Sequence, residues 1–256
     1  MAQDAPTAQG QETSIPDERP DVEHPTDALP RTLALPVMTF EPWTTTTITE
    51  IADLVLTRAG GARALVLVDG TGGSGKSTFA RRLARHIDGA ALVSTDDVSW
   101  HLHPTRWARE MLEGVVQPWF AGDDVDYRPP GWVAKGREGS ITATQSDPHR
   151  AGDGVLIIEG VGAGRHALAD LATFLVWVST DPALARERIL VRDIGIDGDT
   201  REEVAAFLAG WMELEVPFLL EEAPWERADL IVDGASQDPD GDTVRIHHPA
   251  EGHHQP

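Results

Sequence analysis

Eight consecutive residues have the spacing G-x-x-x-x-G-K-S, which is typical of loops that bind nucleotide phosphates. They are Gly70, Thr71, Gly72, Gly73, Ser74, Gly75, Lys76 and Ser77, and Thr78 follows them. Glycines allow the backbone N–H groups of such a loop to point inward at an anion. The lysine reaches the β- and γ-phosphates, and the serine hydroxyl binds Mg²⁺. We therefore expect a triphosphate site here; the alternative is a glycine-rich turn without a ligand.

The residues on either side of this loop have the patterns of a strand and a helix. An apolar run at 64–68 comes directly before the loop, and apolar residues after it recur on one helical face. Those residues are Phe79, Ala80, Leu83, Ala84 and Ile87. A helix that begins near Ser77 directs its unpaired N–H groups and the positive end of its dipole at the same anion. Strand, loop and helix thus occur in the order that a phosphate loop requires.

Acidic residues follow two further predicted strands. A strand at 90–95 ends in Asp96 and Asp97, and a buried strand at 154–158 ends in Glu159. Because the carboxyl ends of parallel strands share one edge of a sheet, we expect these groups to lie near the phosphate loop. We assign Asp96 to accept the proton of an attacking hydroxyl and Glu159 to hold Mg²⁺. The alternatives are that Asp96 and Asp97 cap a turn and that Glu159 is a solvated strand end.

Two arginines are candidates for stabilising a phosphoryl group during its transfer. Arg188 and Arg192 are four residues apart on a predicted helix, so they share one face. They come just before the polar, glycine-containing segment 193–200, which we expect to be a lid loop. Arginines beside a closing lid neutralise the charge on the transferring group while water is excluded. Alternatively, the two arginines pair with surface acids such as Glu187 or Asp193.

Residues 98–152 interrupt the regular pattern and form a predicted insertion on the substrate side. The segment holds four of the eight tryptophans and the only tyrosine, which would let a planar substrate stack on aromatic rings. The candidate substrate-binding residues are Asp97, Tyr127, Arg128 and Trp132. Within the insertion we expect a helix at about 104–113 and a short antiparallel strand at 140–144. The alternative is that the aromatic residues are core.

The rest of the chain alternates between predicted strands and helices. Helices are expected at 44–58, 164–171, 182–192 and 201–222, and further strands at 173–178 and 228–232. This alternation predicts an α/β protein: a three-layer P-loop NTPase fold with a central parallel sheet and helices on both faces. The ends of the chain are polar and rich in Pro and acidic residues, so we expect disordered tails at 1–42 and 235–256 around a domain at 43–234.

Composition limits the remaining possibilities. The 256 residues carry a formal net charge of −21 and contain no basic run, so nucleic acid is not an expected partner. A nucleotide is expected to arrive with its divalent metal, and the other partner to be a small molecule. The chain lacks cysteine, which excludes disulfides, thiolate nucleophiles and Cys-ligated zinc and agrees with a cytoplasmic location. No apolar run is long enough for a membrane span, and nothing in the sequence predicts an oligomeric state.

These motifs together resemble the uridine kinase-like group of P-loop kinases, the superfamily that includes phosphoribulokinase and pantothenate kinase. The resemblance covers about residues 64–234 and lies in Val68–Ser77, Ser94-Thr95-Asp96-Asp97, Ile158-Glu159-Gly160, Arg188-x-x-x-Arg192-Asp193 and Arg227–Val232. It implies an ATP- and Mg²⁺-dependent kinase whose acceptor is the hydroxyl of a nucleoside or a related polar metabolite. By the same resemblance, Asp96 is the general base and Glu159 the acidic metal-site residue. This chain has Val98-Ser99-Trp100 where the group has an aromatic pair, so the acceptor need not be uridine.

Two other classes of protein share part of this pattern. One is a regulatory switch that binds and slowly hydrolyses ATP without a small acceptor. A GTPase with the N-K-x-D guanine motif is excluded because the chain contains no asparagine. The other is a degenerate nucleotide-binding scaffold, which the presence of Lys76, Ser77, Asp96 and Glu159 together disfavours.

Overall fold

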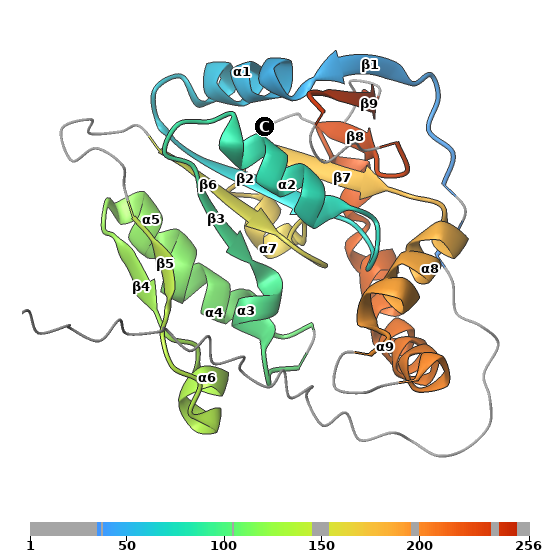
Figure 1. The fold of residues 1–256 in the computed structure, drawn as a ribbon. Coiled ribbons are helices and arrows are strands. Elements are labelled where there is room, and N and C mark those ends of the chain that lie inside the picture. The colour runs from blue at the N-terminus through green and yellow to red at the C-terminus, as the bar shows by residue number, and fades with distance from the viewer. Residues whose placement is uncertain are drawn as a thin grey trace, which may run out of the picture.

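The computed structural model describes residues 35–36, 38–103, 105–144, 154–195, 200–236 and 241–249. Within these ranges, seven strands form the main sheet in the order β1-β9-β8-β7-β2-β6-β3 (Figure 1). Their bounds are β1 (Thr44–Thr47), β2 (Arg63–Asp69), β3 (Ala91–Ser94), β6 (Gly154–Glu159), β7 (Phe174–Ser179), β8 (Leu230–Asp233) and β9 (Thr243–His247). The strands from β8 to β3 are parallel to one another. β9 is antiparallel to β8, and β1 is antiparallel to β9.

Helices connect these strands and cover the sheet. Their bounds are α1 (Ile48–Ala59), α2 (Lys76–Arg85), α3 (Thr95–Ser99), α4 (Ala108–Met111), the π-helical turn η1 (Leu112–Val116), α5 (Gln117–Ala121), α6 (Pro130–Lys135), α7 (His166–Ala169), α8 (Pro182–Asp193), α9 (Arg201–Glu222) and α10 (Pro224–Arg227). A second, two-stranded sheet pairs β4 (Val125–Tyr127) with β5 (Ile141–Ala143). Among the described residues, no helix is long and apolar enough to cross a membrane.

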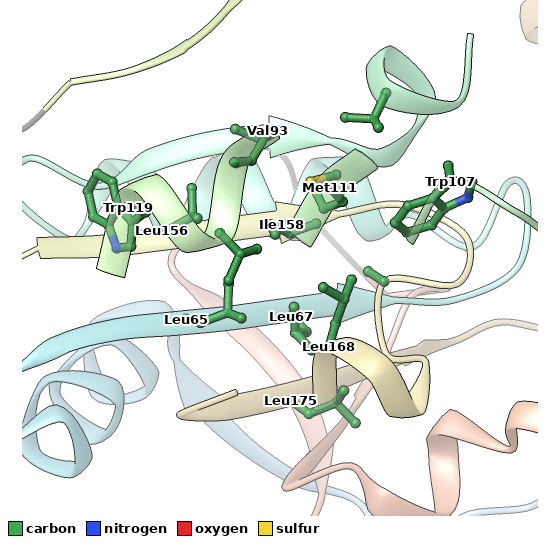
Figure 2. Packing of buried hydrophobic residues seen from close by; sticks show 14 of the residues in the cluster. Leu65, Leu67, Val93, Trp107, Met111, Trp119, Leu156, Ile158, Leu168 and Leu175 are labelled. Carbon is green, nitrogen blue, oxygen red and sulfur yellow. The ribbon is translucent and has the colours of Figure 1, made fainter. Parts of the chain in front are cut away.

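The sheet has a hydrophobic core on each face, as expected for a three-layer α/β protein. Side chains alternate between the two faces of a strand, so Val66 and Val68 pack with α1 and α2 on one side. Leu65 and Leu67 belong to the core on the other side. Figure 2 shows these leucines close to residues of α4, α5 and α7. Burial on both faces explains why β2 is a continuous apolar run.

Several predicted elements are confirmed. The long helix predicted at 201–222 is α9, and Thr200 caps it in a capping box with Glu203. α8 begins after Asp181, whose side chain accepts hydrogen bonds from the first turn, with Pro182 as the first helical residue. The short strand predicted at 140–144 is β5. The helical part of the insertion runs further than expected, from Ala108 through η1 to the end of α5.

Both ends of the domain differ from the prediction. The helix predicted at 44–58 begins at Ile48, as α1. Its threonine run, expected to supply the N-cap, does so through Thr47, but Thr44–Thr47 also form the strand β1. β9 lies within the segment predicted to be a disordered tail, and its Val244 and Ile246 are buried. Ordering that segment is favourable because β9 lies between β1 and β8 and its alternate side chains complete the core. The folded domain therefore extends at least to His247.

Other predictions fall wholly or partly outside the described residues. The predicted N-terminal tail lies outside them up to residue 34, whereas Leu35 is buried and Phe40 packs beside Trp43. In the predicted lid segment 193–200, Asp193 ends α8 and residues 196–199 lie outside the described part. The insertion is described except for 104 and 145–152, and the C-terminal tail except for 237–240 and 250–256.

Candidate active site

The ends of three neighbouring parallel strands bring the predicted catalytic groups to one edge of the sheet. β6 lies between β2 and β3, and Glu159 at its end is in register with Val68 on one side and Ser94 on the other. The phosphate loop follows β2, and Asp96 lies two residues beyond the end of β3. In Figure 1 both chain segments leave the sheet at the same edge. The topology therefore gathers the loop and the two carboxylates, as predicted.

The phosphate loop has a conformation that requires glycine. Gly73 and Gly75 have φ angles of +72° and +96°, which side-chain-bearing residues rarely adopt. A Cβ atom on Gly73 would also lie 2.2 Å from the carbonyl oxygen of Ala185, because α8 packs directly on the loop. Gly75 is the N-cap of α2, so no side chain covers the first turn of this helix. The loop and the N-terminus of α2 together have the geometry of an anion-binding site.

The Lys76 side chain reaches back across the phosphate loop to Thr71. It is the first residue of α2, and its Nζ donates a 3.2 Å hydrogen bond to the carbonyl oxygen of Thr71. The side chain is buried, at 9% exposed. The lysine that reaches the β- and γ-phosphates in such loops thus lies beside Thr71.

Ser77 and Glu159 form the candidate metal site. The Ser77 hydroxyl donates a 2.9 Å hydrogen bond to Glu159 Oε2. A hydroxyl and a carboxylate are hard oxygen ligands of the kind Mg²⁺ takes, usually together with water and substrate phosphates. No group of three acidic or histidine side chains that could hold a metal occurs in the described residues. The pair therefore fits a Mg²⁺ ion that takes its other ligands from the nucleotide and from water.

Asp96 is an exposed carboxylate at the start of α3. The Ser94 side chain accepts a hydrogen bond from its backbone N–H and thereby caps the helix. Within the described part of the chain, no group hydrogen-bonds the Asp96 carboxylate itself. Its charge acts on Arg192 and Glu215, which belong to α8 and α9. Asp96 is thus accessible and turned toward the loop side of the site, which suits a proton acceptor.

The two candidate arginines have different surroundings. Arg188 donates hydrogen bonds from Nη1 to the carbonyl oxygens of Gly234, at 2.9 Å, and Gly73, at 3.5 Å. It therefore lies against the phosphate loop. Arg192 forms an ion pair with Asp193, and this hydrogen-bonded carboxylate raises the pKa of the guanidinium. The surface-pair alternative therefore holds for Arg192 but not for Arg188.

Trp132 and Asp97 are part of one packed cluster. The Trp132 indole is only 5% exposed and donates a 2.8 Å hydrogen bond to the Asp97 carbonyl oxygen. The Arg137 guanidinium lies 3.7 Å from the centre of the Trp132 ring and donates to the Asp97 carboxylate at 3.0 Å. The expectation that a substrate stacks on Trp132 is wrong, because burial and Arg137 already cover the ring.

Tyr127 and Arg128 hydrogen-bond within the insertion. The Tyr127 hydroxyl donates to Glu110, and its pKa is raised by burial and then by this carboxylate. The ring lies against Gly114, where a Cβ atom would meet it at 2.5 Å. Arg128 donates to the carbonyl oxygen of Arg137. Tyr127 thus holds β4 against α4 and η1, and Arg128 contacts Arg137, which in turn pairs with Asp97.

Sequence reasoning missed Asp69, the residue directly before the loop. It is fully buried and accepts hydrogen bonds of 2.7, 2.9 and 2.8 Å from the N–H groups of Gly70, Gly162 and Gly164. Burial raises its pKa to about 6 although these donors oppose the shift. Asp69 thus ties the phosphate loop to the turn after Glu159. The sequence feature that could have identified Asp69 is an acidic residue at the end of an otherwise apolar strand.

Glu215 of α9 was also missed. Its side chain is 7% exposed, and Oε1 accepts a 3.2 Å hydrogen bond from the Gly72 N–H. Oε2 accepts from the Trp211 indole, and burial raises the pKa of the carboxyl. In the sequence Glu215 follows Leu208 at a helical spacing of seven residues, so it falls on the apolar face of the helix. An acidic residue at a position where the helical pattern predicts an apolar one could have identified Glu215 from the sequence.

A cavity of about 710 Å³ adjoins Thr71 and Gly72 of the phosphate loop. Its walls come from the loop, the end of β7, helices α8 and α9, and the segment before β1. Lining residues near the loop include Thr71, Gly72, Ile189, Met212 and Glu215. Its volume is within the range of small-molecule sites.

No protein-family model matches the chain, and no curated protein is similar to it in sequence. Among solved structures, a "putative fructose transport system kinase" from Silicibacter sp. TM1040 is similar at 21% identity, over 72% of this chain and 95% of that one, with a TM-score of 0.47. A "possible uridine kinase" from Bacillus stearothermophilus is similar at 15% identity, over 72% and 96%, with a TM-score of 0.42. A shikimate kinase from Bacteroides thetaiotaomicron is similar at 16% identity, over 70% and 89%, with a TM-score of 0.33.

The assignment of the fold rests on the chain's own strand order and on the loop at the end of β2. This protein has the α/β fold of the P-loop NTPases, with motifs similar to those of uridine kinase-like kinases.

Proposed function

We propose that this protein is an ATP- and Mg²⁺-dependent kinase that phosphorylates a hydroxyl of a small molecule, a nucleoside or a related polar metabolite. One observation carries the proposal: Glu159 lies in register between the strand that precedes the loop and the strand that precedes Asp96, and it is hydrogen-bonded to Ser77. A phosphate cradle, a metal-binding pair and a proton acceptor are the parts that phosphoryl transfer needs.

Each part has a role in the proposed reaction. The N–H groups of the loop and of the first turn of α2 hold the triphosphate, and Lys76 neutralises charge on its β- and γ-phosphates. Ser77 and Glu159 would hold Mg²⁺, which shields phosphate charge when bound. The acceptor oxygen attacks the γ-phosphorus, its proton passes to Asp96, and the bond to the ADP oxygen breaks. Arg188, beside the loop, adds positive charge there.

The acceptor is proposed to approach from the side of α3 and the insertion. Asp97, Tyr127 and Arg128 remain the candidates for contacting it, since they lie in the segments that follow β3. Trp132 is not among them, because Arg137 covers its ring and its indole donates to the Asp97 backbone within the packed cluster.

Acceptor-dependent turnover tests this proposal. The protein is incubated with ATP, Mg²⁺ and a panel of nucleosides and other hydroxyl-bearing metabolites, with ADP release and a mass gain of one phosphate as readouts. A kinase gives ADP release that depends on one acceptor and is lost in Lys76→Ala. ATP hydrolysis at the same rate with every acceptor and with none would instead identify a regulatory switch.

A further inference from the structure

The cavity beside the phosphate loop is bounded on one side by the chain segment before β1. Residues of 35–36 and 38–43 line it together with residues of β7, α8 and α9. In Figure 1 this segment runs from β1 toward α8. The Phe40 ring lies 6.3 Å from the Trp43 ring and 5.8 Å from the His247 ring of β9, centre to centre. These contacts hold the wall against the main sheet.

Most side chains that line this cavity are apolar. β7 contributes Trp177, and α8 contributes Ala185 and Ile189. The apolar lining residues of α9 recur at helical spacing and so share one face of the helix. They are Ala205, Leu208, Ala209, Met212 and Val216. Apolar walls around a volume of this size are typical of sites that hold the body of a small organic molecule.

The charged groups that line the cavity are mainly acidic. Among the described lining residues the only basic one is Arg186. The acidic ones are Glu41, Asp181, Glu213, Glu215 and Asp233. Since this excess of negative charge surrounds apolar walls, the cavity favours a ligand that is both apolar and positively charged.

The two buried carboxylates among these residues have different partners. Asp233 pairs with Arg245 at 2.9 Å. Glu215 accepts hydrogen bonds from two uncharged donors, the Gly72 N–H and the Trp211 indole, and within the described part of the chain it forms no ion pair. Burial raises its pKa, so the charged form is disfavoured. Because a carboxylate can accept about four hydrogen bonds, Glu215 can take a further, cationic donor from the cavity.

We propose that this cavity binds a small molecule with an apolar body and one ammonium group, and that Glu215 holds the ammonium group. The ligand is separate from the proposed acceptor, because none of the described residues that line the cavity belongs to α3 or to the insertion. It contacts the phosphate loop at Thr71 and Gly72, which are part of the wall. The inference goes beyond the proposed function and does not depend on it.

A matched pair of probes tests the proposal. Tryptamine and tryptophol share one bicyclic body, and only tryptamine is cationic at neutral pH. Their dissociation constants are measured without nucleotide by ligand-observed NMR. We expect tryptamine to bind about tenfold more tightly, because its charge lies beside a buried carboxylate. Equal affinities, or binding of neither probe, would overturn the proposal.

Glu215→Gln should remove this preference. The glutamine keeps the shape and can still accept from the Gly72 N–H, so the affinity for tryptophol should stay within about twofold and that for tryptamine should fall to the same level. If the variant weakened both probes equally, the carboxylate would only shape the cavity and the proposal would be wrong.

Glu213→Gln is the control for overall charge. Glu213 is on the same helix and lines the same cavity, but it is exposed. Because water screens an exposed charge, this variant should change the affinity for tryptamine by no more than about twofold. A loss as large as that in Glu215→Gln would contradict a specific role for Glu215.

A second pair of variants locates the probes. Ala209 is exposed and lines the cavity, whereas Ala206 is exposed on the same helix and does not line it. Ala209→Trp should weaken both probes at least about fivefold, because less of their apolar surface can be buried. Ala206→Trp should leave both within about twofold. If Ala209→Trp had no effect, the probes would bind elsewhere and the proposal would be refuted.

ADP separates this site from the proposed nucleotide site. With Mg²⁺ and saturating ADP present, tryptamine should still bind. Mutually exclusive binding would assign the cavity to the nucleotide and overturn the inference. If the protein bound no ADP, the proposed function would fail, whereas the binding of tryptamine would be unaffected.

Discussion

The Ser77 hydroxyl donates a 2.9 Å hydrogen bond to Glu159, joining the first turn of α2 to the end of β6. This contact brings together a residue of the loop motif and an acid more than eighty positions later in the chain. It defines the candidate Mg²⁺ site and leads to the first prediction.

Glu159→Gln should weaken Mg²⁺ binding in the nucleotide complex by about 10- to 100-fold, because an amide oxygen is a poorer ligand for Mg²⁺ than a carboxylate. The glutamine can still accept the Ser77 hydrogen bond, so the fold should not change. The measurement is a Mg²⁺ titration of the protein with a non-hydrolysable ATP analogue. Nucleotide binding in the presence of a chelator is the control and should match the wild type; an unaltered Mg²⁺ titration would remove Glu159 from the metal site.

Asp96→Asn should lower kcat by about 10²- to 10⁴-fold, because an amide cannot take the proton of the acceptor. ATP affinity should change by no more than a few-fold, since Asp96 belongs to α3 and not to the phosphate loop. The control is Asp97→Asn, which we expect to raise the KM of the acceptor more than it lowers kcat. Near-normal turnover in Asp96→Asn would show that another group is the base.

Asp69 should make stability depend on pH. Its pKa is about 6 in the folded protein and 3.8 when unperturbed, so the folded state binds more protons than the unfolded state between these values. The stabilisation is fully present below pH 3.8 and is lost as pH rises through 6. The shift of roughly two pKa units corresponds to about 3 kcal/mol.

The comparison of wild type with Asp69→Asn isolates this effect. Unfolding free energies from chemical denaturation are measured between pH 4 and 7. Relative to the variant, the wild type should become less stable by up to about 3 kcal/mol as pH rises. Parallel pH profiles for the two proteins would show that Asp69 titrates normally.

Ile246→Ala should lower the free energy of unfolding by about 2–5 kcal/mol, because it leaves a cavity beneath β9. Ile246 is 5% exposed, whereas Thr243 on the same strand is exposed. Thr243→Ala is the control and should change stability by no more than about 0.5 kcal/mol. Equal effects of the two substitutions would mean that β9 does not contribute to the core.

Trp132→Phe should destabilise the protein by about 1–3 kcal/mol, because the partly buried Asp97 carbonyl oxygen loses its donor. Since the indole is covered by Arg137, the KM of the acceptor should stay within about twofold of the wild-type value. Thermal unfolding and steady-state kinetics measure the two quantities. A large rise in the KM of the acceptor without a loss of stability would show that Trp132 contacts the substrate after all.

The sequence alone predicted the parts of the site that depend on local chemistry. The phosphate loop is recognisable because close approach of backbone to anion demands glycines such as Gly73 at fixed spacing from Lys76. Asp96 and Glu159 were found because each follows an apolar run that predicts a strand. The carboxyl ends of parallel strands lie at the same edge of the sheet. The capping residues Asp181 and Thr200 likewise act on their own helices, so α8 and α9 could be predicted from nearby residues.

Tertiary structure decided what depends on residues far apart in the chain. β1 is a run of four threonines and β9 is polar on one side. They become strands only because each pairs with the other and β9 completes the core beside β8. Glu215 contacts Gly72, 143 positions away, and Asp69 contacts the turn at Gly162 to Gly164. The sequence shows only that these two acids occupy apolar positions; their partners are set by how helices and loops dock on the finished sheet.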